Sequence, residues 1–353
     1  LRVGADAAMR RAEYDRALSL LDQHADISRR LRLPEAHPTR IEALLVRAEV
    51  RSSQGAYGEA DALAEEALAL VDLGADDEIG ARALDVAAHV AFRRGDPALA
   101  EARFTEALQR FDRLDRQVDA SRCLRGLARI AEREGRRSVA FQAYLHSLEL
   151  CRANDDAIGI AASLRGMGRT DTSRPEGSSA ELEEALGVAE TSGDMLGVGR
   201  ALLALGEHAL RTLRPRDAIV RFRDALELAR RIGAAREEAL ARVGNGRAAL
   251  SLRRMREARA DLTEGLRTVE RLGETQVELV VHVSLLMCAL IQRDMTAFGH
   301  HAWAVRRLLE TASSVEPEVM RILLEAGTTT HDARDRAELR VLTELAAQRS
   351  RTN

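Results

Sequence analysis

A period of about forty residues runs along most of the chain and constrains its fold more than any other feature. The period is marked by one position, small in seven of eight occurrences, that recurs at Ala17, Ala60, Ala100, Ala140, Ser178, Ala218, Ala258 and Phe298. The successive intervals are 43, 40, 40, 38, 40, 40 and 40 residues. Such regularity over 353 residues predicts one long repeat array rather than several unrelated domains.

Each period has the pattern of two helices joined by a tight turn. Residues 84–93 and 98–114 have helical patterns, and Gly95-Asp96-Pro97 separates them. Gly95 can adopt the left-handed conformation that ends a helix, Asp96 can cap the next helix, and Pro97 suits the first helical position. One hairpin cannot bury its apolar face alone, so neighbouring hairpins must stack to form a continuous core.

Composition favours the same all-α fold class. Hydrophobic residues make up 46% of the chain, but aromatic residues only 3%. A sheet protein would use more β-branched and aromatic residues, so the abundance of Ala and Leu favours helix.

The formal net charge is −3, and none of the 53 basic residues is a lysine. This near-neutral balance disfavours general nucleic-acid binding, and the shortage of aromatics disfavours single-stranded nucleic acid in particular.

The pattern within each period resembles the tetratricopeptide repeat family. The matching positions include Gly55-Ala56-Tyr57, Ala60 and Ala67-Leu68; Gly95, Ala100, Phe104 and Ala107-Leu108; and Leu205-Gly206, Ala218, Phe222 and Ala225-Leu226. The resemblance covers nearly the whole chain and implies a right-handed α-solenoid of about eight hairpins. The family repeat has about 34 residues, and its first-helix Trp and terminal Pro are mostly absent here. The chain therefore looks like the extended repeats of bacterial transcription activators, signalling ATPases and kinase-linked proteins.

Two segments interrupt the period. Residues 170–179 form a polar stretch rich in Pro, Gly and Ser, which predicts an exposed loop or hinge. After Pro317 the repeat positions fade, and two further helical patterns predict a C-terminal cap with a polar outer face. We therefore expect a repeat array over 1–315 and capping helices with a short tail over 316–353.

No pattern of residues predicts catalysis, a cofactor or a metal site. Gly166-Met-Gly-Arg169, Gly197-Val-Gly-Arg200 and Gly244-Asn-Gly-Arg247 imitate phosphate loops, but they lie in or beside first helices rather than between a strand and a helix. His300 and His301 are adjacent, so on a helix they diverge and cannot hold a metal unaided. The chain has no HExxH, CxxC or Ser-His-Asp grouping. We expect a protein that is not an enzyme.

The tetratricopeptide resemblance implies a concave inner wall lined by five positions of each first helix. In four successive hairpins, ten of these twenty positions are arginine and three are acidic. The predicted partner-binding residues are Arg82, His89, Arg93, Arg122, Arg125, Arg129, Arg133, Arg165, Arg169, Arg200 and Arg211. Several guanidinium groups in one concavity would attract an acidic peptide, a terminal carboxylate or a phosphorylated partner. Alternatively, individual arginines pair with acids on adjacent helices, such as Asp119 or Glu132.

Two functional hypotheses follow. The first is an interaction module or scaffold that holds a partner protein along its inner face. The second is the regulatory sensor of a larger bacterial signalling protein, linked to a Ser/Thr kinase or an ATPase domain.

The longest uncharged run, Leu279–Gln292, has fourteen residues, too few to span a bilayer. Three cysteines without CxxC spacing and no visible signal peptide favour a soluble, cytoplasmic protein with no membrane partner.

The seventh hairpin differs from the others. Its lining positions are all apolar: Val280, Val283, Met287, Leu290 and Ile291. An exposed apolar stripe would mark a binding surface. We favour the alternative, in which the C-terminal helices cover the stripe as a lid. The two interpretations predict opposite solvent exposure for these five side chains.

Overall fold

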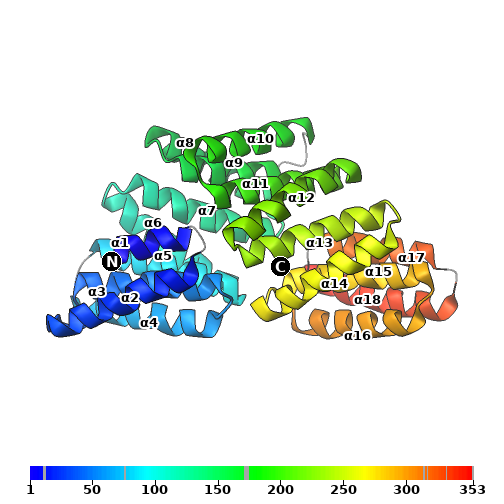
Figure 1. Ribbon diagram of the computed structural model, residues 1–353, viewed down its shortest axis with the longest axis horizontal. Helices are drawn as coiled ribbons and strands as arrows, with labels where there is room; N and C mark the ends of the chain where they lie inside the picture. Colours follow the sequence, from blue (N-terminus) through cyan, green and yellow to red (C-terminus); the bar gives the residue numbers. More distant parts are fainter. Residues whose placement is uncertain are drawn as a thin grey trace. The chain divides into compact units, whose positions relative to one another are not determined.

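The computed structural model describes residues 1–353 apart from 11–12, 75–76, 171–174, 313–314, 316, 331 and 352–353. Across the described residues, helix is the only regular secondary structure, as the sequence predicts (Figure 1). The chain divides into two compact units, Leu1–Ala201 and Leu202–Asn353. The sequence predicted a division near residue 315 and gave no sign of one after Ala201.

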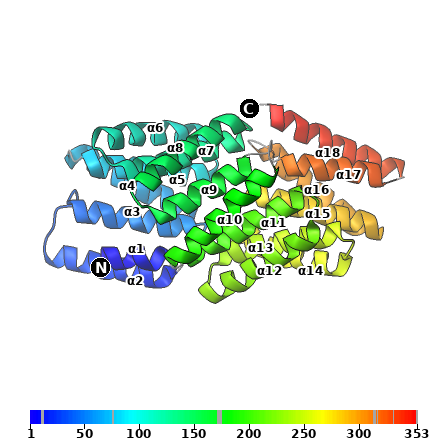
Figure 2. The same cartoon turned by 90° about the horizontal axis from the view of Figure 1, so that it is seen from above.

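The first unit is a succession of helical hairpins. It contains α1 (Arg2–Arg10), α2 (Tyr14–Arg30), α3 (Pro38–Ser53), α4 (Tyr57–Gly74), α5 (Asp77–Arg94), α6 (Pro97–Arg113), α7 (Gln117–Arg133), α8 (Arg137–Ala153), α9 (Ala157–Thr170), α10 (Pro175–Ser192) and the start of α11 (Met195–Arg211). Each odd-numbered helix from α1 to α9 packs against the even-numbered helix that follows it. In addition, α1 packs against α3, α3 against α5, α5 against α7, and α7 against α9 (Figure 2). The odd-numbered helices therefore form one layer within this unit.

The second unit holds the rest of α11 and seven further helices. They are α12 (Pro215–Ile232), α13 (Ala235–Ser251), α14 (Met255–Leu272), α15 (Thr275–Gln292), α16 (Met295–Thr311), α17 (Pro317–Thr329) and α18 (Ala333–Arg351). Helix α13 packs against α15, and α15 packs against α17. Eight hairpins and a C-terminal helical pair thus appear in the described residues, which agrees with the predicted count.

The predicted marker positions lie at the helix contacts. The six alanines of the series are fully buried, Ser178 is buried, and Phe298 is 6% exposed. Glycines in the first helices have the same role, because a Cβ atom on Gly126 would lie 2.5 Å from the Phe104 ring. The three phosphate-loop look-alikes all lie on α9, α11 and α13. Gly168 in the first of them packs against Leu182, so helix packing accounts for its lack of a side chain.

The Gly95-Asp96-Pro97 turn has the geometry that its sequence predicts. Gly95 has a φ of +95°, in the left-handed region where glycine avoids the strain of a side chain. The backbone N–H of Asp96 donates to the Ala91 carbonyl at 2.9 Å, which ends α5. The Asp96 carboxylate accepts a hydrogen bond from the Leu99 backbone N–H at 3.1 Å, and Pro97 begins α6. This turn reverses the chain within a few residues.

The segment 170–179 is more helical than the sequence predicted. Thr170 is the last residue of α9, and α10 begins at Pro175, so 175–179 belong to a helix. Proline fixes φ near the helical value and lacks an N–H that would go unpaired at a helix start, which favours this boundary. The remaining part of the predicted loop, 171–174, lies outside the described residues.

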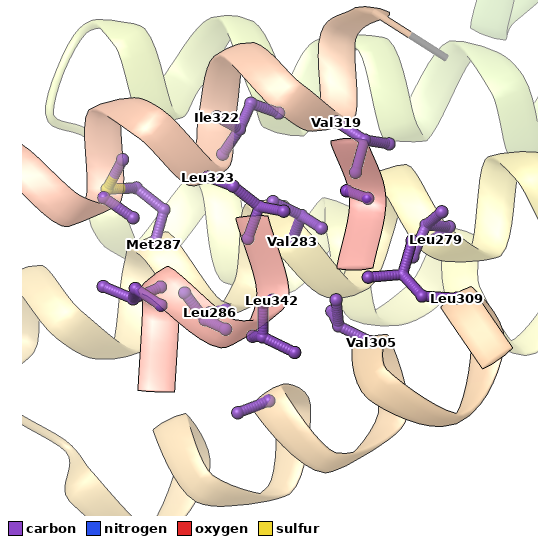
Figure 3. Close-up of a cluster of buried hydrophobic side chains, with 14 of the residues drawn as sticks. Leu279, Val283, Leu286, Met287, Val305, Leu309, Val319, Ile322, Leu323 and Leu342 are labelled. Carbon is purple, nitrogen blue, oxygen red and sulfur yellow. The ribbon is translucent and has the colours of Figure 1, made fainter. Parts of the chain in front are cut away.

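The apolar stripe that the sequence analysis assigned to the seventh hairpin lies on α15, in the eighth hairpin of the structure, and it is covered, as the lid interpretation predicts. Val280, Val283, Met287 and Leu290 on α15 are at most 7% exposed. Figure 3 shows α15 side chains facing Val319, Ile322 and Leu323 of α17 and Leu342 of α18, with α16 on the other side. Ile291 is partly buried against the same cluster. The stripe is therefore part of the core of the second unit and is not a free binding surface.

Helix α15 is longer than the uncharged run that the sequence shows. In the described part of the chain it is the one helix whose length and composition would allow it to cross a membrane. Its eighteen residues, Thr275–Gln292, include twelve that are buried against the rest of the protein. A core position between α13, α16 and α17 accounts for the apolar character of this helix.

A partly buried ion-pair network ties α17 to the rest of the second unit and predicts a pH dependence. Arg247 on α13 donates to Glu318 and to Glu207, each at 2.6 Å, and Arg321 also donates to Glu318 at 2.8 Å. Burial raises the pKa of Glu318, but the hydrogen bonds and charges of Arg321 and Arg247 prevail and lower it to about 2.

Because the pKa of Glu318 is depressed by folding, its ion pairs stabilise the folded state above about pH 4.5 and are lost as the pH falls toward 2. We expect Glu318→Gln to lower the free energy of unfolding by about 2 kcal/mol at pH 7. The difference from wild type should shrink between pH 5 and pH 3. Urea unfolding over this range measures it, and a difference independent of pH would contradict the assignment.

Candidate functional site

The predicted partner-binding residues lie on first helices of successive hairpins. Helix α5 carries Arg82, His89 and Arg93; α7 carries Arg122, Arg125, Arg129 and Arg133; α9 carries Arg165 and Arg169; and α11 carries Arg200 and Arg211. Because α5, α7 and α9 pack side by side, residues from these helices come close together in the first unit. Arg211 belongs to the second unit, where its guanidinium lies 3.4 Å from Nδ1 of His208.

Three of the arginines pair with an acid on the preceding first helix. Arg82 lies 3.5 Å from Glu42 of α3, and Arg122 pairs with Asp85 of α5. Arg169 donates two hydrogen bonds to Glu132 of α7, at 2.8 and 3.0 Å. These contacts hold neighbouring hairpins together. For these three residues the structure shows the alternative that the sequence left open, in which arginines pair with acids on adjacent helices.

Asp85 is the centre of the pairing between α5 and α7. Its carboxylate is fully buried, Arg122 neutralises it, and the Cys123 thiol donates to it at 3.5 Å. His89 Nε2 lies 3.7 Å away, and its ring packs edge-on against Phe104. Burial and the neighbouring arginines lower the pKa of His89 to about 3, although Asp85 opposes the shift. His89 is therefore neutral at pH 7 and adds no positive charge to the surface.

Arg125 has neutral partners. Its guanidinium donates to the hydroxyl oxygens of Ser121 and Ser147, at 3.0 and 3.1 Å, and to the Cys151 sulfur at 3.3 Å. Ser147 and Cys151 lie on α8, the second helix of the same hairpin. Hydroxyl and thiol partners leave the positive charge of Arg125 without a counter-ion among these contacts.

Aromatic and arginine side chains meet between α5 and α7. The guanidinium carbon of Arg129 lies 4.6 Å from the centre of the Phe92 ring, and that of Arg133 lies 5.7 Å from it. A cation over an aromatic face is attracted by the ring's quadrupole. Phe92 therefore holds two positive groups of α7 beside α5.

The surroundings of Arg165 on α9 disfavour its positive charge. Burial, followed by the charges of Arg200 and Arg169, lowers the pKa of Arg165 to about 9. No carboxylate in the described part of the chain lies within ion-pair distance of its guanidinium, although Asp194 exerts a weaker opposing effect. At pH 7 Arg165 remains charged, so a bound anion would relieve the repulsion that it experiences.

We refer to Arg129, Arg133, Arg165 and Arg200 as the cationic row. Its members extend from α7 across α9 to the first turns of α11, within the first unit. Two cavities of the described residues lie on other helices. One cavity, of about 410 Å³, lies among α2, α3 and α4, and a shallow depression of about 480 Å³ lies on α8. The concave groove implied by the resemblance therefore remains a prediction.

Sequence reasoning missed the acids and the aromatic ring that position these arginines. Glu42, Asp85 and Glu132 each precede their arginine partner by 37 to 40 residues, about one repeat. Because consecutive first helices lie side by side, an acid and an arginine one period apart are neighbours in space. That spacing is visible in the sequence and would have indicated these three pairs.

Comparison with known families agrees with this architecture. A family model described as "Tetratricopeptide repeat" matches residues 81–153, which cover most of α5 and all of α6, α7 and α8. Residues 81–153 contain tetratricopeptide repeats. No curated protein matches the sequence. The repeat type predicted from the residues is thus confirmed.

Several solved structures share the fold of this chain at low sequence identity. A Rap protein complexed with competence and sporulation factor has a TM-score of 0.72 and 11% identity, and the match covers 100% of this chain and 98% of that one. The Rap conjugation gene regulator of plasmid pLS20, in complex with the Phr* peptide, has a TM-score of 0.63, 13% identity and coverages of 94% and 95%. A signal transduction ATPase with a tetratricopeptide repeat sensor, from Pyrococcus horikoshii, has a TM-score of 0.57 and 12% identity, with coverages of 96% and 53%.

Proposed function

We propose that this tetratricopeptide protein is an interaction module whose cationic row binds an acidic or phosphorylated segment of a partner protein. The observation that carries the proposal is Arg165, a charged guanidinium beside Arg200 and Arg169 with no ion-paired carboxylate in the described residues. Repulsion among these groups costs free energy in the unbound protein. A bound anion would be attracted to these guanidinium groups and would also reduce the repulsion between them.

The chemistry of the row suits a planar anion. A guanidinium offers two parallel N–H groups that match the spacing of carboxylate and phosphate oxygens. Arg129 and Arg133 are held over Phe92, so less side-chain freedom is lost when they bind. We expect the partner to contribute Asp, Glu, a phosphorylated side chain or a C-terminal carboxylate.

A regulatory sensor is the second candidate function. It is favoured by the fold shared with a Rap protein complexed with competence and sporulation factor and with a regulator complexed with the Phr* peptide. In a sensor of this kind, a peptide on the cationic row would change how neighbouring hairpins pack. Tetratricopeptide arrays are typically non-catalytic, and we assign no reaction to this chain. Its free thiols, Cys123, Cys151 and Cys288, suit a reducing compartment such as the cytoplasm.

Arg165→Gln tests the proposal. An array of peptides that differ only in acidic, phosphorylated, neutral or amidated ends selects the ligand, and fluorescence anisotropy then gives the affinities. We expect the variant to bind the best acidic peptide about tenfold or more weakly, because a hydrogen bond to a charged group contributes about 1.5–3 kcal/mol. Added salt should weaken binding to the wild type more than binding to the variant.

Arg29→Gln is the matched control. Arg29 lies on α2, its side chain is 73% exposed, and it pairs with Asp26. Its replacement should change affinity less than twofold. Arg165→Gln removes a source of repulsion, so its melting temperature should be unchanged or higher, and weaker binding would not reflect unfolding. Equal affinity and equal salt dependence in wild type and Arg165→Gln would reject the cationic row as the binding surface.

A further inference from the structure

Three side chains that can bind a metal converge at the α14–α15 turn of the second unit. Glu270 lies in the last turn of α14, Glu278 in the first turn of α15, and His282 one turn further along α15. One ligand atom from each lies within 4.8 Å of the other two. Glu278 and His282 are four residues apart, so they project from the same face of the helix. The tight turn after Gly273 brings Glu270 to them.

The imidazole of His282 is held in a fixed position. The residue is 4% exposed, and its Nδ1 lies 3.0 Å from Nδ1 of His301 on α16. At this distance the two ring nitrogens form a hydrogen bond, in which one Nδ1–H donates to the lone pair of the other Nδ1.

If His282 is the donor in this bond, its Nε2 carries a lone pair. This Nε2 lies 4.0 Å from a carboxylate oxygen of Glu278, too far for a hydrogen bond. A nitrogen lone pair and two carboxylates then face one another, and all three groups are acceptors. Metal-bound histidines commonly donate their second ring N–H to a fixed acceptor, which is the arrangement that His301 provides.

The two carboxylates disfavour each other. An oxygen of Glu270 and an oxygen of Glu278 lie within 4.8 Å of each other, so the two negative charges repel. Arg307 offsets part of this repulsion, but its guanidinium lies 3.7 Å from the Glu278 oxygen and is itself largely exposed. A cation between the three side chains would neutralise the carboxylates more effectively than this distant contact.

We propose that Glu270, Glu278 and His282 bind a divalent first-row metal ion, with Zn²⁺ the best fit. This departs from the sequence-based expectation of no metal site, which considered only neighbouring residues such as His300 and His301. One imidazole and two carboxylates suit Zn²⁺ better than Mg²⁺, which prefers oxygen ligands alone. Zn–N and Zn–O bonds of about 2.0–2.2 Å require the carboxylates to move closer by side-chain rotation. The ion would link the end of α14 to the start of α15.

Zinc titration of the purified chain tests this proposal. We expect isothermal titration calorimetry to show one Zn²⁺ per chain and thermal unfolding to shift upward when Zn²⁺ is added, because the ion binds only the folded state. Glu278→Gln and Glu270→Gln should each weaken Zn²⁺ binding by tenfold or more. Mg²⁺ at the same concentrations should have no effect.

Glu264→Gln is the matched control on α14. Glu264 is half-exposed, pairs with Arg267 and lies outside the cluster, so its replacement should leave Zn²⁺ affinity unchanged. His301→Gln tests the positioning contact and should weaken binding less than Glu278→Gln does. Unchanged affinity in both carboxylate variants would overturn the proposal. The proposal would also be overturned if only the His300→Gln, His301→Gln double variant lost Zn²⁺ binding, because the two imidazoles would then form the site.

Discussion

Replacement of Phe222 with alanine is expected to destabilise the second unit by about 3–5 kcal/mol. Phe222 on α12 is fully buried, and its ring fills the space left by two glycines of the neighbouring first helices. A Cβ atom on Gly206 of α11 would lie 2.6 Å from this ring, and one on Gly244 of α13 would also overlap it. Removing the ring leaves a cavity where three helices meet. Urea unfolding followed by circular dichroism measures the loss.

A double-variant cycle tests whether ring and glycine are complementary. Gly244→Ala should destabilise the wild type because its methyl group overlaps the ring, whereas in Phe222→Ala it should be tolerated or partly fill the cavity. Trp303→Ala on α16 is the control, because Trp303 is 61% exposed and should cost less than about 1 kcal/mol. Additive effects of the two substitutions would show that the close approach of these helices does not depend on this pair.

Arg122→Met should destabilise the first unit by about 3 kcal/mol, since it leaves the Asp85 carboxylate buried without its counter-ion. Asp85 is fully buried, and Arg122 supplies the neutralising charge from the next first helix. Burial lowers the pKa of Arg122, but Asp85 together with Glu49 and Asp119 raises it by more, and the net pKa lies above the usual value. The free energy of unfolding at pH 7 measures the cost.

Adding Asp85→Asn to Arg122→Met should recover more than half of the lost stability, because no charge then remains buried. Arg82→Met is the matched control in the same layer. Its partner Glu42 also pairs with Arg2 at 2.8 Å, so this substitution should cost less than about 1 kcal/mol. If the Asp85→Asn double variant were no more stable than Arg122→Met alone, the cost would come from lost packing and not from the buried carboxylate.

The fold was largely predictable because packing requirements recur with the period. Ala60, Ala100 and Ala140 lie where two backbones approach closely, and a larger side chain would separate the helices. Gly95-Asp96-Pro97 specifies its turn locally, so its geometry also followed from the sequence. The division after Ala201 was not predictable, because it depends on how many contacts cross each hairpin boundary, and the repeat positions alone do not determine these.

The candidate site was only partly predictable, because the neighbours on other helices decide whether the charge of an arginine is neutralised. Arg122 on α7 pairs with Asp85 of α5, whereas Arg165 on α9 lies beside Arg200. The Glu270–Glu278–His282 cluster was missed for a related reason. The spacing of Glu278 and His282 is visible in the sequence, but the approach of Glu270 depends on the α14–α15 turn.

The most direct test of the central claim is to locate a bound acidic peptide on the protein. A peptide selected for affinity would carry a photoactivatable group beside its acidic residues, and mass spectrometry would identify the cross-linked positions. We predict cross-links to α7, α9 and the first turns of α11, near Arg129, Arg165 and Arg200, and their loss in Arg165→Gln. Cross-links confined to the even-numbered helices α6, α8 and α10, unchanged in that variant, would contradict the account.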